Sequence, residues 1–177
     1  MKKTSILKLM VVGPCLLVGY AALTNSSGAP AGRSGSPASG NTTCTACHSG
    51  PAITTQNISI TTDIPSTGFA ENTDYTITIT ANNGGIGSRI GFEASVESAN
   101  SSGFAGTVTA GTGNQKTGSY ITHTSAGNTP TNNEKSWSFT WNSGTAADAT
   151  VYVAVNFANG NNNTDGDAIG TKTLQLI

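Results

Sequence analysis

Charged and aromatic side chains are scarce in this chain of 177 residues: Asp, Glu, Lys and Arg make up 10% of it, and Phe, Trp and Tyr 6%. The basic residues number only eight, too few for the basic surface of a nucleic-acid-binding protein, so that class is excluded. Three of them, Lys2, Lys3 and Lys8, lie at the start of the chain. Without this start, five basic residues stand against nine acidic ones, a net charge near −4. A mildly acidic protein disfavours anionic partners.

Cysteine and methionine are also rare, with three and two residues. Cys15, Met1 and Met10 all lie near the start, which leaves Cys44 and Cys47 as the cysteines of the remaining chain. A disulfide between two cysteines so close together would close a very short loop and stabilise little. Structural zinc needs four ligands, and no second cysteine pair supplies them. The remaining pair therefore indicates chemistry rather than cross-linking.

The first 24 residues have the pattern of a secretory signal peptide, with lysines followed by an apolar run from Leu9 to Leu23. Gly19-Tyr20-Ala21 is a small-x-small cleavage site, cuts near Ala22 to Thr24 are alternatives, and the run is short for a membrane span. Two alternatives stay open: an uncleaved leader that anchors the chain in a membrane, and a lipid on Cys15. The pattern predicts export, to the periplasm, the cell surface or the extracellular space.

Residues 44–52 contain Cys44-Thr45-Ala46-Cys47-His48, the spacing of c-type haem attachment. The separation of the two thiols matches that of the two vinyl groups of the porphyrin. The residue after the second cysteine then lies under the ring, where His48 can ligate the iron as the proximal ligand. The alternatives are a chance pattern and a redox-active dithiol, but a thioredoxin-like dithiol requires a βαβ context that this sequence lacks.

His123 is the only other histidine and the candidate for the sixth ligand of the iron. Because both methionines lie in the leader, a His/Met cytochrome is excluded. Two neutral imidazoles would give a low-spin iron of low potential, suited to electron transfer. The alternative is a surface histidine at a strand end. In that case the open iron site would suit a haem sensor or a peroxidase-like enzyme.

Residues 25–43 form a linker rich in Gly, Ser and Pro, expected to be extended and mobile, or else to lie against the domain in fixed turns. Residues 53–177 show strand-like alternation without an amphipathic helix, which predicts an all-β, antiparallel, immunoglobulin-like sandwich. Residues 111–118 are expected to be a turn. The expected strands are Gln56–Thr62, Asp74–Ala81, Arg89–Val96, Phe104–Ala110, Ser119–His123, Lys135–Trp141, Thr150–Phe157 and Thr171–Ile177.

The aromatic side chains are expected to fill the core of the sandwich rather than to line a haem pocket. They are Tyr75, Phe92, Trp137, Trp141 and Phe157.

Two polar loops carry residues that suit other chemistry. Asp165 and Asp167 offer oxygen ligands of the kind that Ca²⁺ takes, although their spacing departs from the EF-hand loop. A hairpin loop is the default interpretation there. Residues 82–87 are expected to form a hairpin turn rather than a nucleotide-binding loop. No Ser-His-Asp set or carboxylate pair supports a hydrolase.

A family resemblance rests on the motif and on the segments that surround it. The upstream residues Gly28–Pro37, the motif itself and the later strands resemble bacterial exported proteins with a Reeler-like (reelin-type) β-sandwich. The strand segments that carry it are Arg89–Ala94, Tyr120–Thr124, Ser136–Trp141 and Val151–Ala158. That group is often labelled a choice-of-anchor type and is common in Bacteroidota. The resemblance implies an immunoglobulin-like fold and an extracellular or cell-surface location, and little about activity.

Taken together, the patterns predict an exported monohaem c-type cytochrome-like protein that transfers single electrons to a redox partner protein of the cell envelope. Its cofactor would be haem c, with Ca²⁺ as a minor alternative. The competing hypothesis is a surface adhesion or interaction module with a structural haem. An electron carrier or binding module is expected rather than an enzyme. No nucleic acid is expected as a partner, self-association is left open, and membrane contact is expected only with an uncleaved leader.

Overall fold

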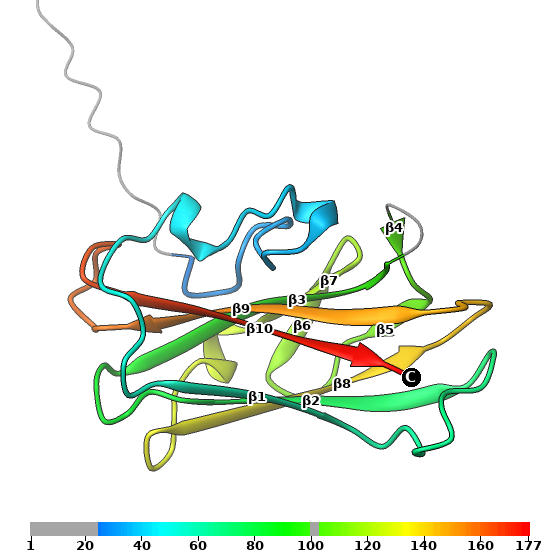
Figure 1. Ribbon diagram of the computed structural model, residues 1–177. Helices are drawn as coiled ribbons and strands as arrows, with labels where there is room; N and C mark the ends of the chain where they lie inside the picture. The colour runs from blue at the N-terminus through cyan, green and yellow to red at the C-terminus, as the bar shows by residue number, and fades with distance from the viewer. Residues whose placement is uncertain (1–24, 100–102) are drawn as a thin grey trace, which may run out of the picture.

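The computed structural model describes residues 25–99 and 103–177 (Figure 1). The predicted leader, with Cys15 and both methionines, lies outside the described residues. Within the two described ranges, no helix has the length and apolar character needed to cross a membrane.

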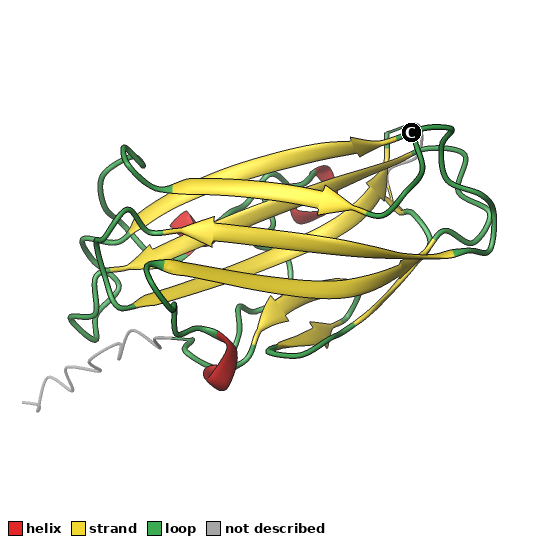
Figure 2. Ribbon diagram, turned by 90° about the horizontal axis from the view of Figure 1, so that it is seen from below, coloured by secondary structure: helices red, strands yellow, loops and turns green. Residues whose placement is uncertain are grey.

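Two antiparallel sheets face each other, as the sequence predicted for the fold class (Figures 1 and 2). The first sheet has the order β1-β2-β8-β5, and the second has the order β10-β9-β3-β7-β6 with β4 paired to β3. The strands of the first sheet are β1 (Asn57–Thr62), β2 (Asp74–Asn82), β8 (Glu134–Asn142) and β5 (Thr107–Thr109). Those of the second are β10 (Ala168–Leu176), β9 (Ala149–Ala158), β3 (Arg89–Ser98), β7 (Tyr120–His123), β6 (Asn114–Thr117) and β4 (Gly103–Phe104).

Alternating side chains explain why the strands stack in this way, because every second residue of a strand faces the opposite sheet. On β9 the valines and Phe157 face inward, and β9 is a central strand between β3 and β10, as its two-sided apolar pattern predicted. The rings of Phe92 and Trp137 pack in the core with centroids 4.4 Å apart. All five aromatic residues singled out in the sequence belong to this core, as predicted, although Phe92 also lines the cavity described below.

Three expectations about local structure need correction. Strand β6 lies within residues 111–118, which were expected to be a turn, and buried Asn114 anchors it through a bond from its Nδ2 to the Ser138 carbonyl. The expected strand Phe104–Ala110 is divided into β4 and β5, with Gly106 between them at a φ of 65°. Residues 82–87 do not form a hairpin, because β2 and β3 belong to different sheets.

Residues 25–48 lie on the outer face of the second sheet as a third layer (Figure 1). Ser34 is buried there and its hydroxyl lies 3.1 Å from that of Ser95 on β3. The backbone N–H of Ala38 donates to Oε2 of Glu97 at 2.9 Å. Residues 25–43 therefore lie against the domain in fixed turns and do not form an extended, mobile linker. The regular elements of the third layer are the short 3₁₀ helices η1 (Pro37–Ser39) and η2 (Cys44–Ala46).

Candidate functional site

A cavity of about 350 Å³ lies between this third layer and the second sheet. Cys44, Cys47, His48 and His123 all line it, so the four residues predicted for the haem site share one cavity. The volume falls in the range of small-molecule and cofactor sites. Folding thus brings His123 to a motif from which 75 positions separate it in the sequence.

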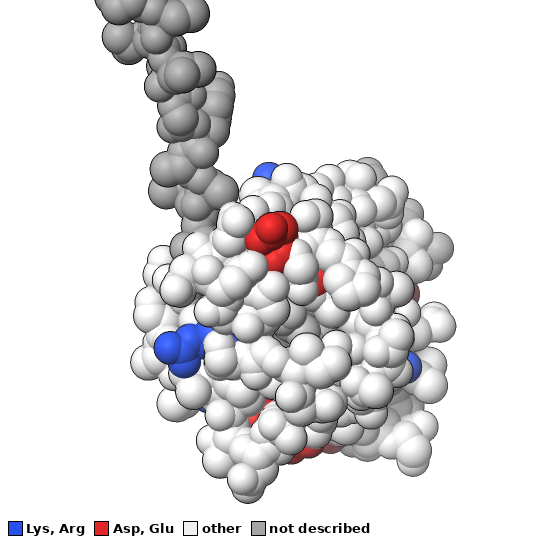
Figure 3. All heavy atoms as spheres, turned by 90° about the vertical axis from the view of Figure 1, so that its left-hand side faces the viewer, with Lys and Arg blue, Asp and Glu red and all other residues white. Residues whose placement is uncertain are grey.

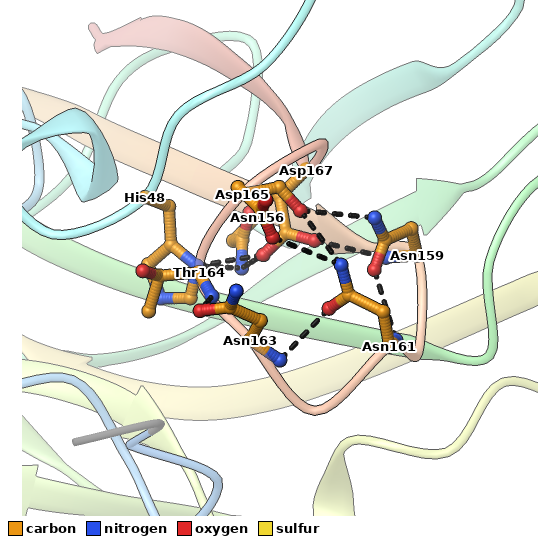
Figure 4. Close-up of polar contacts among 8 residues, drawn as sticks. All are labelled: His48, Asn156, Asn159, Asn161, Asn163, Thr164, Asp165 and Asp167. Atoms are coloured by element: carbon orange, nitrogen blue, oxygen red, sulfur yellow. Dashed lines mark hydrogen bonds and ion pairs between the residues drawn. The ribbon is translucent and has the colours of Figure 1, made fainter. Parts of the chain in front are cut away.

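His48 is fixed by a buried carboxylate from the residue directly before β10 (Figure 4). Its Nδ1 lies 2.6 Å from Oδ2 of Asp167, which is fully buried. Nδ2 of Asn156, on β9, lies 3.1 Å from His48 Nδ1 and donates to the same carboxylate oxygen at 3.1 Å. With the proton on Nδ1 shared with Asp167, Nε2 of His48 is left as the ring nitrogen with a free electron pair, as metal-ligating histidines require.

Backbone bonds hold the motif against the β9–β10 loop. The N–H of Ser49 donates to the Thr164 carbonyl at 2.8 Å, and the N–H of Asp167 donates to the Ser49 carbonyl at 3.1 Å. Gly50 makes this approach possible, because a Cβ there would lie 2.0 Å from the carbonyl oxygen of Asp167. The position of His48 is therefore set by main-chain contacts as well as by its own side chain.

His123 ends β7 and is 7% exposed, so the alternative of a surface histidine does not hold. The backbone N–H of Phe92 donates to its Nδ1 at 3.1 Å, and the same Nδ1 lies 3.3 Å from the carbonyl oxygen of Phe92. With Nδ1 as the acceptor, the neutral ring carries its proton on Nε2. Binding of a metal ion by Nε2 would require the other tautomer, in which Nδ1 donates to the Phe92 carbonyl. Burial lowers the pKa of His123, which favours the neutral imidazole, the form that binds metal ions.

Gly91 provides the space for the His123 ring on the outer face of β3. A Cβ at this position would lie 2.7 Å from Cε1 of His123 and 3.1 Å from each ring nitrogen. Asn156 is the register partner of Gly91 on β9. Both histidines therefore contact the sheet at the same level, His123 over Gly91 and His48 beside Asn156.

The two cysteines differ in exposure and are both free thiols. Cys44 is buried, and this burial, with the nearby charge of Glu93, raises the pKa of its thiol to about 12. Cys47 is exposed. Both line the cavity as part of the third layer.

Glu93 lies on the outer face of β3 beneath the third layer and is fully buried. Its Oε2 accepts a hydrogen bond from the backbone N–H of Arg33, and its Oε1 has no partner. Burial raises the pKa of Glu93 to about 7. The carboxyl group is thus a proton acceptor close to the cysteine end of the cavity.

Asp165 and Asp167 do not face a common centre (Figure 4). Asp167 is engaged with His48, whereas Oδ1 of Asp165 accepts from Nδ2 of Asn161 at 3.0 Å within the β9–β10 loop. In the part of the chain that the structure describes, no three His, Cys, Asp or Glu side chains form a group that could hold a metal ion. The segment is the loop of the β9–β10 hairpin, as expected by default.

The cavity residues fit a covalently bound haem. Two thiols and two histidines line one cavity, the Nε2 of His48 is left without a proton, and small residues such as Gly91 and Ala158 leave the floor of the cavity open. The side-chain oxygens of Asn128 and Asn156 are buried beside the cavity without a hydrogen-bond partner. Such unpaired buried polar atoms are rare in native proteins.

The sequence interpretation missed three residues of the site: Asn156, Gly91, and Asp167 in its role as partner of His48. Gly91 carries a usable signal, because a glycine inside a strand pattern often marks a close approach of another group. The pairing of Asp167 with His48 depends on the fold and has no local signal.

No family model matches the chain, and no curated protein matches its sequence. Solved structures similar to it are the reeler domain of human F-spondin and the Reelin-N domain of F-spondin. The first has 16% sequence identity and a TM-score of 0.46, and the likeness covers 72% of this chain and 94% of that one. The second has 15% identity and a TM-score of 0.47, with 74% and 93% covered.

Proposed function

We propose that the protein is an exported monohaem c-type electron carrier. The observation that carries this proposal is the shared cavity, which brings Cys44, Cys47, His48 and His123 together from two parts of the chain. Cys44 and Cys47 would hold the porphyrin through thioether bonds. The group would supply a reversible one-electron change at its iron.

His48 and His123 would be the two axial ligands in this proposal. The hydrogen bond to Asp167 orients His48 and increases the basicity of its Nε2. The buried position of His123 over Gly91 keeps its ring neutral and directed at the cavity. With both positions filled by imidazole, the iron is closed to external ligands, which favours electron transfer over peroxide or oxygen chemistry.

The surroundings of the cavity suit a short-lived contact with a redox partner of the cell envelope. The end of the molecule that carries the β9–β10 loop shows few charged side chains, in small separate groups (Figure 3). Gly160, Asn162 and Asn163 of this loop line the cavity. A rim made mostly of small polar residues, with Arg89 as a charged member, is compatible with weak and transient association.

The test is the reduced and oxidised optical spectrum of the exported protein and of its His123→Ala variant. We expect covalent haem with a low-spin spectrum in the wild type, and a high-spin spectrum with carbon monoxide binding in the variant. Asn128→Ala, which changes another buried residue of the same cavity, is the matched control and should stay low-spin.

An unchanged low-spin spectrum in His123→Ala would exclude His123 as a ligand. Rapid peroxide turnover by the wild type would favour an enzyme with an open site. Stable haem without reversible reduction would favour the alternative of an interaction module with a structural haem.

A further inference from the structure

The cavity has two chemically different ends along β3. Arg89, Gly91 and Glu93 succeed one another on the outer face of this strand, since Ile90 and Phe92 between them point into the core. A strand advances about 3.3 Å per residue, so Arg89 and Glu93 are separated by ~13 Å. Arg89 and Gly91 line the cavity directly.

The cysteine end lies at the level of Glu93. Arg33, which lines the cavity together with Cys44, donates its backbone N–H to Glu93, and the charge of Glu93 contributes to the raised pKa of the Cys44 thiol. The middle level is that of Gly91 and its register partner Asn156, where the two histidines contact the sheet. The iron ligands therefore lie between Cys44 and the level of Arg89.

The far end is formed by Arg89 and by amide side chains. Arg89 pairs in register with Ala158, and the β9–β10 loop that follows Ala158 contributes Asn162 and Asn163 to the cavity. Nη1 of Arg89 donates to the hydroxyl of Thr129, which leaves further N–H groups of the guanidinium for a ligand. Among the residues that the structure describes, no carboxylate forms an ion pair with Arg89.

We propose that Arg89 binds a propionate carboxylate of the haem; this inference rests on the proposed function. Haem carries its two propionates on the edge opposite its vinyl groups, and the vinyl edge belongs at Cys44 and Cys47. With the iron ligands between the two ends, the carboxylate edge meets Arg89. A guanidinium forms paired, charge-assisted hydrogen bonds with a carboxylate, which an amide side chain does not replace.

The experiment compares haemin with haemin dimethyl ester, which lacks the free carboxylates. The host is the full chain with Cys44→Ala and Cys47→Ala, in which haemin binds without covalent bonds and dissociation constants follow from the Soret band. Arg89→Gln is the test variant in this host. Lys172→Gln, which removes an exposed charge on β10 away from the cavity, is the control, and Arg33→Gln examines the other arginine of the cavity.

Arg89→Gln should weaken haemin binding by about tenfold, since hydrogen bonds to charged groups are the strong ones. The same substitution should leave the affinity for the dimethyl ester unchanged, and Lys172→Gln should change neither affinity. Equal losses for haemin and its ester, no loss at all, or an ester-dependent loss in Arg33→Gln alone would overturn the assignment to Arg89. Absence of a Soret shift with either compound in the host would instead show that the proposed haem site itself is wrong.

Discussion

Asp167 and His48 are 119 positions apart in the sequence, yet His48 Nδ1 lies 2.6 Å from Oδ2 of the buried carboxylate. In the proposed haem site, a carboxylate in this position would make Nε2 a stronger iron ligand and would thereby favour the oxidised iron. Asp167→Asn should therefore raise the midpoint potential of the haem protein. The measurement is an optical redox titration.

Asp165→Asn is the matched control for this change. Asp165 belongs to the same loop, but its carboxylate accepts from Asn161 and not from His48. It should leave the potential within the error of the titration. A potential that stays constant in Asp167→Asn, or that shifts equally in both variants, would contradict the role assigned to Asp167.

Gly91→Ala should displace His123 from the cavity. The new Cβ would lie 2.7 Å from Cε1 of the ring, closer than real Cβ contacts allow, so the ring has to move away from β3. We expect loss of the low-spin spectrum while circular dichroism keeps the β-sheet signature. Gly103→Ala is the control, because nothing lies within 4 Å of a Cβ there. A low-spin spectrum retained in Gly91→Ala would argue against ligation by His123.

The docking of the third layer predicts slow hydrogen exchange at defined amides. Ala29 donates to the hydroxyl of Thr122 at 2.8 Å, and Ala38 donates to the buried carboxylate of Glu97 at 2.9 Å. Both amides should be protected, whereas the amide of Thr67 in an exposed turn should exchange fast. Native-state exchange followed by NMR or mass spectrometry decides the matter. Exchange of Ala29 and Ala38 at the rate of an unfolded chain would mean that the segment is a mobile tether.

Glu93 makes the stability of the apoprotein depend on pH. Its pKa is about 7 in the folded chain against a usual 4.5, so between these values the folded state holds a proton that the unfolded state has released. Stability should fall as pH rises through this window, by at most about 1.4 kcal/mol per pH unit. Glu93→Gln should remove this slope in urea titrations at several pH values. Glu134→Gln, at an exposed position, is the control and should keep the slope of the wild type. An identical slope in wild type and Glu93→Gln would refute the prediction.

The sandwich and the motif were both accessible from the sequence because each depends on local patterns. Alternation on β2, β8 and β9 identifies strands wherever one face is buried. The motif Cys44–His48 is read directly from its spacing. The short strand β6 was not predicted, because its side chains show no apolar alternation and the side-chain amide of Asn114 holds it in place.

The sequence left open whether residues 25–43 dock in fixed turns and whether His123 joins the site, because both depend on polar contacts between distant segments. The segment 25–43 has no hydrophobic periodicity, and its backbone is held by carboxylates on β3 that a sequence pattern would place in solvent. His123 has polar neighbours in the sequence, yet the third layer and Gly91 enclose it. Glu93 and Glu97 are both buried, and their carboxylates hold the backbone of the docked segment.

The central claim is that a haem is bound covalently in the cavity between the third layer and the second sheet. The most direct test is a pyridine haemochrome spectrum, with an intact mass, of the protein exported by a host that attaches haem to such motifs. We expect one covalent haem per chain in the wild type and none in the double variant Cys44→Ser/Cys47→Ser. A wild-type chain that carries the mass of the polypeptide alone and gives no haemochrome band would contradict it.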